Sequence, residues 1–178
     1  PVFHGFGLGI GIHTALIGGA CCILVPKFNV NTYADLLIKK QPNIIPGVPT
    51  LFEALLRAEK LENADLSCLK GVFSGGDSLS VELKKKLDKF LYDHKASIQV
   101  REGYGLTECA PLVSVNPHDI DYHSGSIGLP VPSTEAKLVD DEGNEVPHGE
   151  PGELCVRGPQ VMLGYWQRPD ATDEIIKD

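Results

Sequence analysis

Arg101-Glu102-Gly103-Tyr104-Gly105-Leu106-Thr107-Glu108 is the stretch around which this chain is organised. It places an aromatic ring between two glycines and then a hydroxyl beside a carboxylate. Glycines let a backbone approach a ligand closely, the ring can stack on a flat base, and the Thr–Glu pair offers hard oxygens to a phosphate-bound Mg²⁺. Because Gly-x-Gly weakens any helix or strand, no folding need explains the grouping. The eight residues alone leave a surface turn with an incidental tyrosine as an equal alternative.

The composition is that of a soluble globular protein. The 178 residues suffice for one domain with a real core or for two small ones, and 42% are hydrophobic and 22% charged. The net charge of −8 argues against a nucleic-acid partner, since phosphate binding needs clustered Lys and Arg. The one basic run, Lys84-Lys85-Lys86, falls in a helical pattern and is most simply a solvated face.

Cysteine usage and hydropathy favour the cytoplasm. The five cysteines form no C-x-x-C pair and have no zinc spacing, which predicts reduced thiols. No signal peptide and no apolar run of transmembrane length is present. The chain starts at Pro1 without an initiator Met and ends inside an amphipathic pattern, so we expect it to be an excerpt of a longer protein. The cysteines are Cys21, Cys22, Cys68, Cys109 and Cys155.

The first 19 residues are rich in glycine, but they do not match a dinucleotide-binding loop. No G-x-G-x-x-G register fits, and no strand precedes the glycines. We expect a close-packed helix or loop. His4, between Phe3 and Gly5, is a candidate pocket residue, although a lone histidine in an apolar setting is more often structural.

A regular alternation of strands and helices follows. Apolar runs predict strands at residues 20–25, 43–48, 71–74 and 97–100. Helices are predicted from Asn31 to about Lys40, from a capping box with Thr50 at N-cap and Glu53 at N3, and from about Ser80 to His94. This order predicts an α/β fold with a parallel-type sheet and flanking helices.

Three glycine-rich segments follow these strands, and they carry the strongest structural argument for a site. Open parallel sheets bind ligands just beyond the carboxyl ends of their strands, so these segments should line one rim. This favours a binding site over an incidental turn. The segments are Gly47-Val48-Pro49, Gly75-Gly76-Asp77 and Gly103-Tyr104-Gly105.

After Pro111 the helical periodicity disappears. Short β-like runs at 136–139 and 153–157 flank a hairpin turn at 140–144, which predicts a small antiparallel sheet or a distorted barrel. A helix should start within 168–172. We therefore divide the chain into an α/β subdomain at 1–113, a connecting loop at 114–123 and a small β subdomain at 124–178, truncated at its C-terminal end.

Tyr104-Gly105-Leu106-Thr107-Glu108 resembles the Y-G-x-T-E core motif of the adenylate-forming (AMP-binding) superfamily. Further matches occur in the family's order, and the last 30 residues look most like bacterial long-chain fatty acid–CoA ligases. Ordered matches from end to end make chance a poor explanation. They are Pro1-Val2-Phe3-His4, Gly75-Gly76-Asp77-Ser78-Leu79, the turn at 126–132 (S-I-G-L-P-V-P), and the signature at 152–159 (G-E-L-C-V-R-G-P) with Gly164-Tyr165-Trp166.

The resemblance implies a two-step reaction. ATP and a carboxylic acid, here a fatty acid, give an acyl-adenylate and pyrophosphate, and CoA then attacks to give the thioester. It also implies roles for individual residues. Glu108 would help hold Mg²⁺, Thr107 would contact phosphate and Tyr104 would stack on adenine. The backbone of Gly75, Gly76 and Asp77 would pass along base and ribose with Gly103 and Gly105 nearby, and His4, Gly105 and Leu106 would border the acyl pocket.

The chain also departs from the family pattern. Asp77-Ser78 replaces the usual Ala-Pro, a change that contacts through the backbone would survive. The phosphate loop with its Lys, the Asp that binds the ribose hydroxyls and the C-terminal domain with its catalytic Lys would lie outside these residues. We expect the isolated chain to be inactive. The alternatives are a ligase for an aromatic or short-chain acid, a peptide-synthetase adenylation domain, which we disfavour, and a catalytically incomplete nucleotide-binding module. A lipid substrate would allow peripheral contact with the inner face of the membrane.

Overall fold

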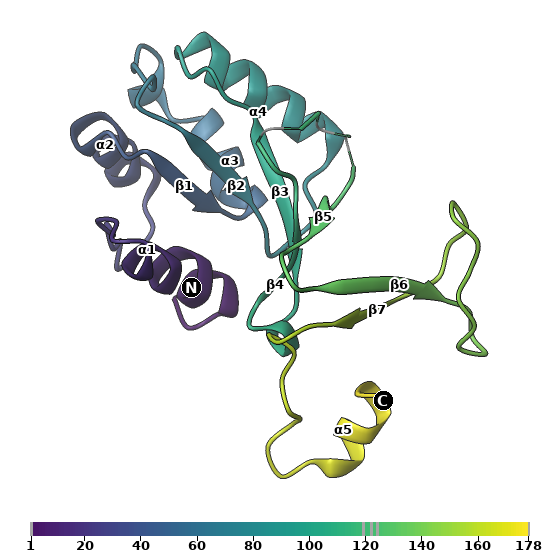
Figure 1. The fold of residues 1–178 in the computed structure, drawn as a ribbon. Coiled ribbons are helices and arrows are strands. Elements are labelled where there is room, and N and C mark those ends of the chain that lie inside the picture. Colours follow the sequence, from purple (N-terminus) through teal and green to yellow (C-terminus); the bar gives the residue numbers. More distant parts are fainter. Residues whose placement is uncertain (1, 119, 122, 124, 178) are drawn as a thin grey trace.

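The computed structural model describes residues 2–118, 120–121, 123 and 125–177. Pro1 of the N-terminal motif, Ser124, where we expected the β-rich part to begin, and Asp178 lie outside the described residues. Figure 1 shows a sheet flanked by helices, from which a narrow two-stranded ribbon projects, with the last helix beyond it. The predicted α/β class is confirmed.

The main sheet has five strands in the order β1-β2-β3-β4-β5. Three strands, β1 (Ile44–Gly47), β2 (Gly71–Ser74) and β3 (Val100–Gly105), pair in parallel. Helix α3 (Pro49–Leu56) and the short η2 (Glu59–Leu61) lie between β1 and β2, and α4 (Val81–Asp93) lies between β2 and β3. The last two strands, β4 (Leu112–Val115) and β5 (Leu129–Pro130), add antiparallel. This is the predicted alternation, because parallel neighbours need a crossover between them.

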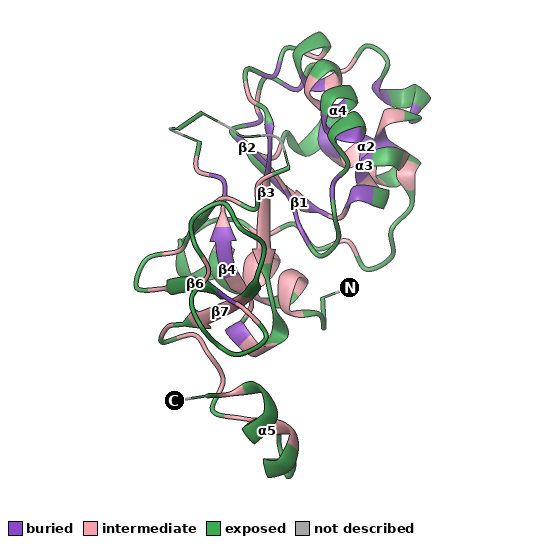
Figure 2. Ribbon diagram, turned by 90° about the vertical axis from the view of Figure 1, so that its right-hand side faces the viewer, coloured by how far each residue is buried: buried purple, intermediate pink, exposed green. Residues whose placement is uncertain are grey.

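The core lies between the parallel strands and the helices. Figure 2 shows buried residues on β1, β2 and β4 and on the facing sides of α2 (Val30–Lys40), α3 and α4, and the first two residues of β3 are buried as well. On α4 the predicted spacing holds, since three leucines of the apolar stripe are buried. The core residues on the three helices are Ala34, Leu37, Phe52, Leu55, Leu83, Leu87 and Leu91.

Two predicted helix starts are wrong. Asn29, not Asn31, caps α2, because its side-chain oxygen accepts the N–H groups of Asn31 and Thr32. The capping box at Thr50 does not form: α3 already begins at Pro49, whose fixed φ suits the first helical position, so Thr50 lies inside the helix. The predicted start of α4 is confirmed, since the Ser80 hydroxyl accepts the N–H of Leu83.

Two predicted strands also differ from the structure. Residues 20–25 form no strand, and Ile23 and Leu24 are exposed, because none of the described strands pairs with this apolar run. The strand predicted at 97–100 begins only at Val100 and continues through Gly105. Pairing of Gly103 with Val115 and of Tyr104 with Ser114 offsets the weak strand preference of glycine.

The N-terminal segment is helical, which is one of the two structures, helix or loop, that we expected for it. It forms η1 (Phe6–His13), a π-helix, followed by α1 (Thr14–Ile17). A Cβ on Gly5 or Gly9 would lie 3.0 or 2.7 Å from the Pro111 side chain, so the glycines allow the helix to pack closely on that proline.

The small sheet consists of β6 (Glu135–Val139) and β7 (Glu153–Arg157), paired antiparallel as predicted. Within the described residues it has these two strands and does not close into the barrel offered as an alternative. Asp140 stabilises the predicted turn by accepting the N–H groups of Glu142 and Asn144. The C-terminal α5 (Pro169–Ile175) starts where expected. None of the helices described is long and apolar enough to cross a membrane.

Candidate active site

The glycine-rich segments lie side by side at one edge of the sheet. The N–H of Gly75 donates to the carbonyl oxygen of Gly47 at 3.1 Å, which joins the ends of β1 and β2. Ser74 pairs with Glu102, so Gly103 stands level with Gly75 on the neighbouring strand. The predicted common rim is confirmed. One detail is corrected, because residues 103–105 belong to β3 itself rather than following it.

The local backbone structure requires a glycine at position 105, which we did not expect. A Cβ at this position would lie 1.9 Å from the carbonyl oxygen of Pro111, and the same oxygen accepts the N–H of Leu106 at 2.8 Å. The strand pairing is irregular here, between Tyr104 and Gly105. The close backbone approach that this glycine permits is therefore made to Pro111, and folding does account for part of the motif.

Tyr104 and the turn after β2 present different surfaces at this rim. Tyr104 is half-buried, whereas Gly76 and Asp77 are exposed. The Asp77 carboxylate accepts the N–H of Ser78 at 2.7 Å, which holds it to its own turn. Gly76 has φ +77°, a conformation that favours glycine, so this segment offers mainly backbone.

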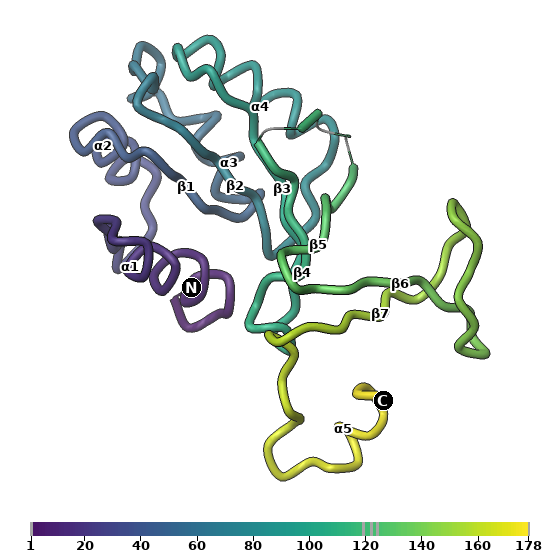
Figure 3. Tube along the Cα trace, viewed as in Figure 1, coloured from purple at the N-terminus to yellow at the C-terminus, as the bar shows by residue number. Residues whose placement is uncertain are grey.

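Thr107 and Glu108 begin the short helix η3 (Thr107–Cys109), directly after β3. Thr107 is exposed and Glu108 half-buried. The Tyr165 hydroxyl donates to Glu108 Oε1 at 2.6 Å, and the N–H of Met162 donates to the Glu108 carbonyl oxygen at 2.8 Å. Figure 3 shows the chain after β7 returning to this end of β3 and β4 before it enters α5.

The hydrogen bond from Tyr165 to Glu108 shifts the pKa of both side chains. Together with the backbone N–H of Glu108, it lowers the pKa of the Glu108 carboxyl below its usual value, because it stabilises the ionised form. The same bond raises the pKa of the Tyr165 hydroxyl, since the donor must keep its proton. Glu108 is therefore a carboxylate at neutral pH.

The Glu108 carboxylate fits one kind of Mg²⁺ site. The described residues contain no group of three or more His, Cys, Asp or Glu that could hold a metal ion. Mg²⁺ is commonly held by one or two carboxylates together with water and substrate phosphates, rather than by an all-protein cage. Glu108 suits a metal ion that arrives with a nucleotide.

The segment that carries His4 borders the same edge of the sheet. His4 is exposed, and its Nδ1 accepts the N–H of Phe6 at 3.2 Å. A Cβ on Gly75 would lie 3.0 Å from the Phe6 ring, so the start of η1 packs on the end of β2. Leu106, on the other side of the motif, is 38% exposed.

The contact between Tyr165 and Glu108 was not predicted from the sequence. Its segment, 164–166, matched a family signature, but no role was assigned to it. The hydroxyl reaches Glu108 across 57 residues of sequence, and no local periodicity or spacing relates two positions so far apart. The signal that the sequence offered was the presence of this family signature further along the chain than the Y-G-x-T-E motif.

Comparison with known proteins gives consistent matches. Residues 1–166 match the family model described as AMP-binding enzyme. The long-chain-fatty-acid–CoA ligase of Escherichia coli O6:H1 is 52% identical over 179 residues, covering all of this chain and 31% of the relative. ATP-bound MatB from Rhodopseudomonas palustris superimposes with a TM-score of 0.89 at 29% identity, over all of this chain and 34% of that one. A long-chain-fatty-acid-CoA ligase from Archaeoglobus fulgidus gives 0.89 at 26% identity, over 98% of this chain and 36% of that one. The chain thus spans about a third of these relatives.

Proposed function

The chain belongs to the AMP-binding enzyme family, and on that premise we propose that it forms part of an ATP-dependent acid–thiol ligase that activates a fatty acid. In the first step a carboxylate oxygen attacks the α-phosphorus of ATP, and the bond to pyrophosphate breaks. In the second step the CoA sulfur loses its proton and attacks the acyl carbon, and AMP leaves with the electrons of the carbon–oxygen bond. The product is the acyl-CoA thioester.

The observation that carries this proposal is the common rim. The ends of β1 and β2 are joined by the Gly75–Gly47 hydrogen bond, and β3 leads directly to exposed Thr107 and ionised Glu108. A flat base with attached phosphates could follow such an edge, and pre-positioned oxygens and N–H groups suit charge that develops on phosphate.

We assign the nucleotide contacts accordingly. Tyr104 stacks on adenine, as aromatic side chains do with bases in other sites. The backbone of Gly75, Gly76 and Asp77 runs along base and ribose beside Gly103 and Gly105, and the Thr107 hydroxyl contacts phosphate. Glu108 would hold Mg²⁺, which when bound neutralises phosphate charge and polarises the phosphoryl oxygens.

The acyl group would lie on the side of the rim bordered by His4, Gly105 and Leu106. Packing of Phe6 against Gly75 and of Gly5 against Pro111 supports this placement, because it brings the N-terminal segment to the edge that carries the motif. A long-chain acid is favoured over an aromatic or short one by the 52% identity to an enzyme named for long-chain fatty acids.

We also propose a cellular location. The five cysteines are unpaired in the structure, which suits a reducing compartment. We place the enzyme in the cytoplasm, with peripheral contact at the inner face of the membrane where a fatty acid would be collected.

The test is ATP–pyrophosphate exchange by the full-length protein with a panel of fatty, short-chain and aromatic acids. We expect exchange with long-chain fatty acids and CoA-dependent thioester formation, and no turnover by the isolated 178 residues. Preferential exchange with an aromatic or short acid would replace the fatty-acid assignment. An absence of exchange with every acid, despite ATP binding, would indicate a nucleotide-binding module without the chemistry.

A further inference from the structure

Tyr165 makes a contact that the proposed reaction does not yet use. Its hydroxyl donates to Oε1 of Glu108 at 2.6 Å, although the two residues belong to separate segments of the chain. A second bond, from the N–H of Met162 to the Glu108 carbonyl oxygen at 2.8 Å, joins the same two segments. One bond holds the side chain of Glu108 and the other holds its backbone.

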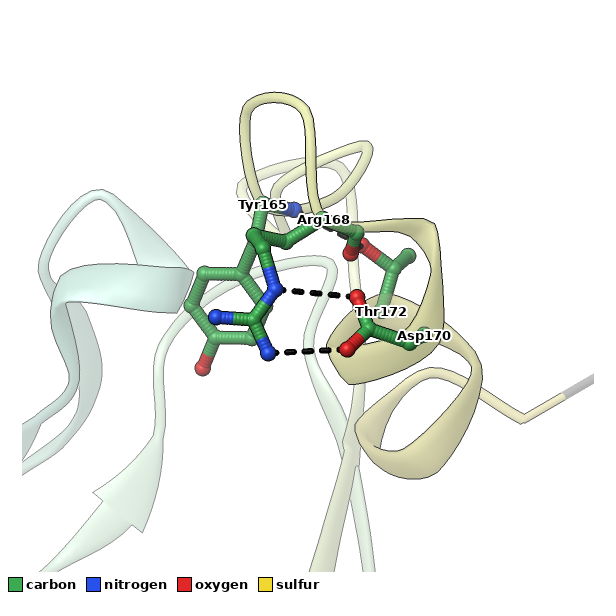
Figure 4. A network of polar contacts seen from close by, with 4 residues as sticks. All are labelled: Tyr165, Arg168, Asp170 and Thr172. Carbon is green, nitrogen blue, oxygen red and sulfur yellow. Dashed lines mark hydrogen bonds and ion pairs between the residues drawn. The ribbon is translucent and has the colours of Figure 1, made fainter.

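Tyr165 is itself held in place from the other side. Its N–H donates to the Thr172 hydroxyl at 2.9 Å, and that hydroxyl donates to the carbonyl oxygen of Arg168, also at 2.9 Å. Arg168 in turn forms a two-bonded ion pair with Asp170 at the start of α5 (Figure 4). The loop before α5 therefore has several bonds that fix where the Tyr165 backbone lies.

Gly164 shows how closely this loop is folded. Its φ is +150°, and a Cβ there would lie 2.7 Å from Thr172 Cγ2 and 2.9 Å from Thr172 Oγ1. A larger residue at position 164 would push the loop away from Thr172 and displace the tyrosine that follows. The glycine, the threonine and the tyrosine thus act as one unit.

We propose that Tyr165 is a positioning residue that aims the Glu108 carboxylate at a nucleotide-bound divalent cation; this rests on the metal-binding role proposed above for Glu108. A carboxylate has about four lone-pair sites, so Oε1 can accept the hydroxyl while the group also binds a metal ion. Outer-shell hydrogen bonds of this kind orient metal ligands and fix their rotamer. The Thr172 hydroxyl in turn holds Tyr165 in place by accepting the backbone N–H of Tyr165.

The test compares four variants of the full-length protein, Tyr165→Phe, Thr172→Val, Glu108→Gln and Tyr92→Phe. The first keeps the ring and removes only the hydroxyl. The last is the control, because Tyr92 is 79% exposed on α4. Mn²⁺ binding in the presence of a non-hydrolysable ATP analogue is measured by electron paramagnetic resonance. The Mg²⁺ dependence of ATP–pyrophosphate exchange and the metal-free affinity for the analogue are measured alongside.

We expect Tyr165→Phe to weaken Mn²⁺ binding about 10-fold and to raise the half-saturating Mg²⁺ concentration by a similar factor. Metal-free nucleotide binding and the melting temperature should stay at the wild-type values. If Tyr165 had a merely structural role, its substitution would change both. Thr172→Val should shift metal binding in the same direction by less.

Two results would overturn the inference in distinguishable ways. Wild-type Mn²⁺ binding by Tyr165→Phe, together with loss of binding by Glu108→Gln, would reject the positioning role and leave the proposed function standing. Wild-type Mn²⁺ binding by Glu108→Gln would reject the role of Glu108 in the proposed function itself, and the inference would fall with it.

Discussion

The carbonyl oxygen of Pro111 occupies the place where a side chain of Gly105 would begin, 1.9 Å from the position of its Cβ. The contact closes the turn that carries Thr107 and Glu108, since the same oxygen accepts the N–H of Leu106. Gly105 is thus required for the motif to fold, whatever it contacts in a complex.

Gly105→Ala should destabilise the protein in the absence of any ligand. Relieving a backbone clash of this kind costs roughly 3 kcal/mol, and denaturant unfolding of the ligand-free protein measures it. Gly11→Ala is the control, because a Cβ there meets nothing within 4 Å. If Gly105→Ala unfolds like the control but loses nucleotide affinity, the glycine serves the ligand instead.

Thr107→Val should affect chemistry and not stability. The residue is exposed, so the free energy of unfolding should change by less than about 0.5 kcal/mol. Because we propose that the Thr107 hydroxyl contacts the reacting phosphate, its loss should lower the adenylation rate roughly 100-fold. The matched control is Thr50→Val, at an exposed position on α3. Equal rates for the two variants would remove Thr107 from the site.

Asp88 anchors the start of β3, and its removal should be costly. Its carboxylate, 20% exposed, accepts the N–H of Val100 at 2.8 Å and pairs with Lys84. The Lys84 side chain is 6% exposed, so the solvated face expected for residues 84–86 is wrong at Lys84. Asp88→Ala should therefore reduce the free energy of unfolding by roughly 1–3 kcal/mol, because it removes the acceptor of the Val100 N–H and one partner of the buried Lys84.

The control for Asp88 is Asp93, whose pair with Lys89 on the same helix is exposed. Asp93→Ala should change stability by about 0.5 kcal/mol or less. Chemical denaturation of both variants decides the matter, and similar losses would show that the burial of the first pair is unimportant.

Tyr33 should make stability fall at alkaline pH. Burial raises its pKa to about 12, because the charged phenolate loses hydration. An unfolded chain ionises this tyrosine near pH 10, so the stabilising contribution is complete below pH 10 and is lost as pH rises towards 12. By pH 11 the loss is about 1 kcal/mol.

Tyr33→Phe should remove that part of the alkaline loss, whereas Tyr92→Phe, at an exposed site, should not. Free energies of unfolding at pH 8 and pH 11 provide the comparison. An identical pH dependence of wild type and Tyr33→Phe would mean that Tyr33 ionises normally in the folded protein.

Local patterns were sufficient where one segment sets its own structure. The leucine spacing of α4 and its Ser80 cap, the Asp140 turn, and the β6 and β7 strands follow from residues close in sequence. Residues 20–25 show the limit. An apolar run specifies burial, but a strand also needs a paired neighbour, and none of the described strands pairs with this run.

For the motif at 101–108, the sequence by itself determined the chemistry on offer: a ring between glycines, a hydroxyl and a carboxylate, at the end of a parallel strand. Only the tertiary structure decided that the Pro111 carbonyl oxygen lies where a Gly105 side chain would begin, and that Glu108 accepts a hydrogen bond from the Tyr165 hydroxyl. The physical reason is that side-chain types and strand order are local properties. A steric clash with a turn six residues away, or a hydrogen bond spanning 57 residues, exists only once packing has brought the two segments together.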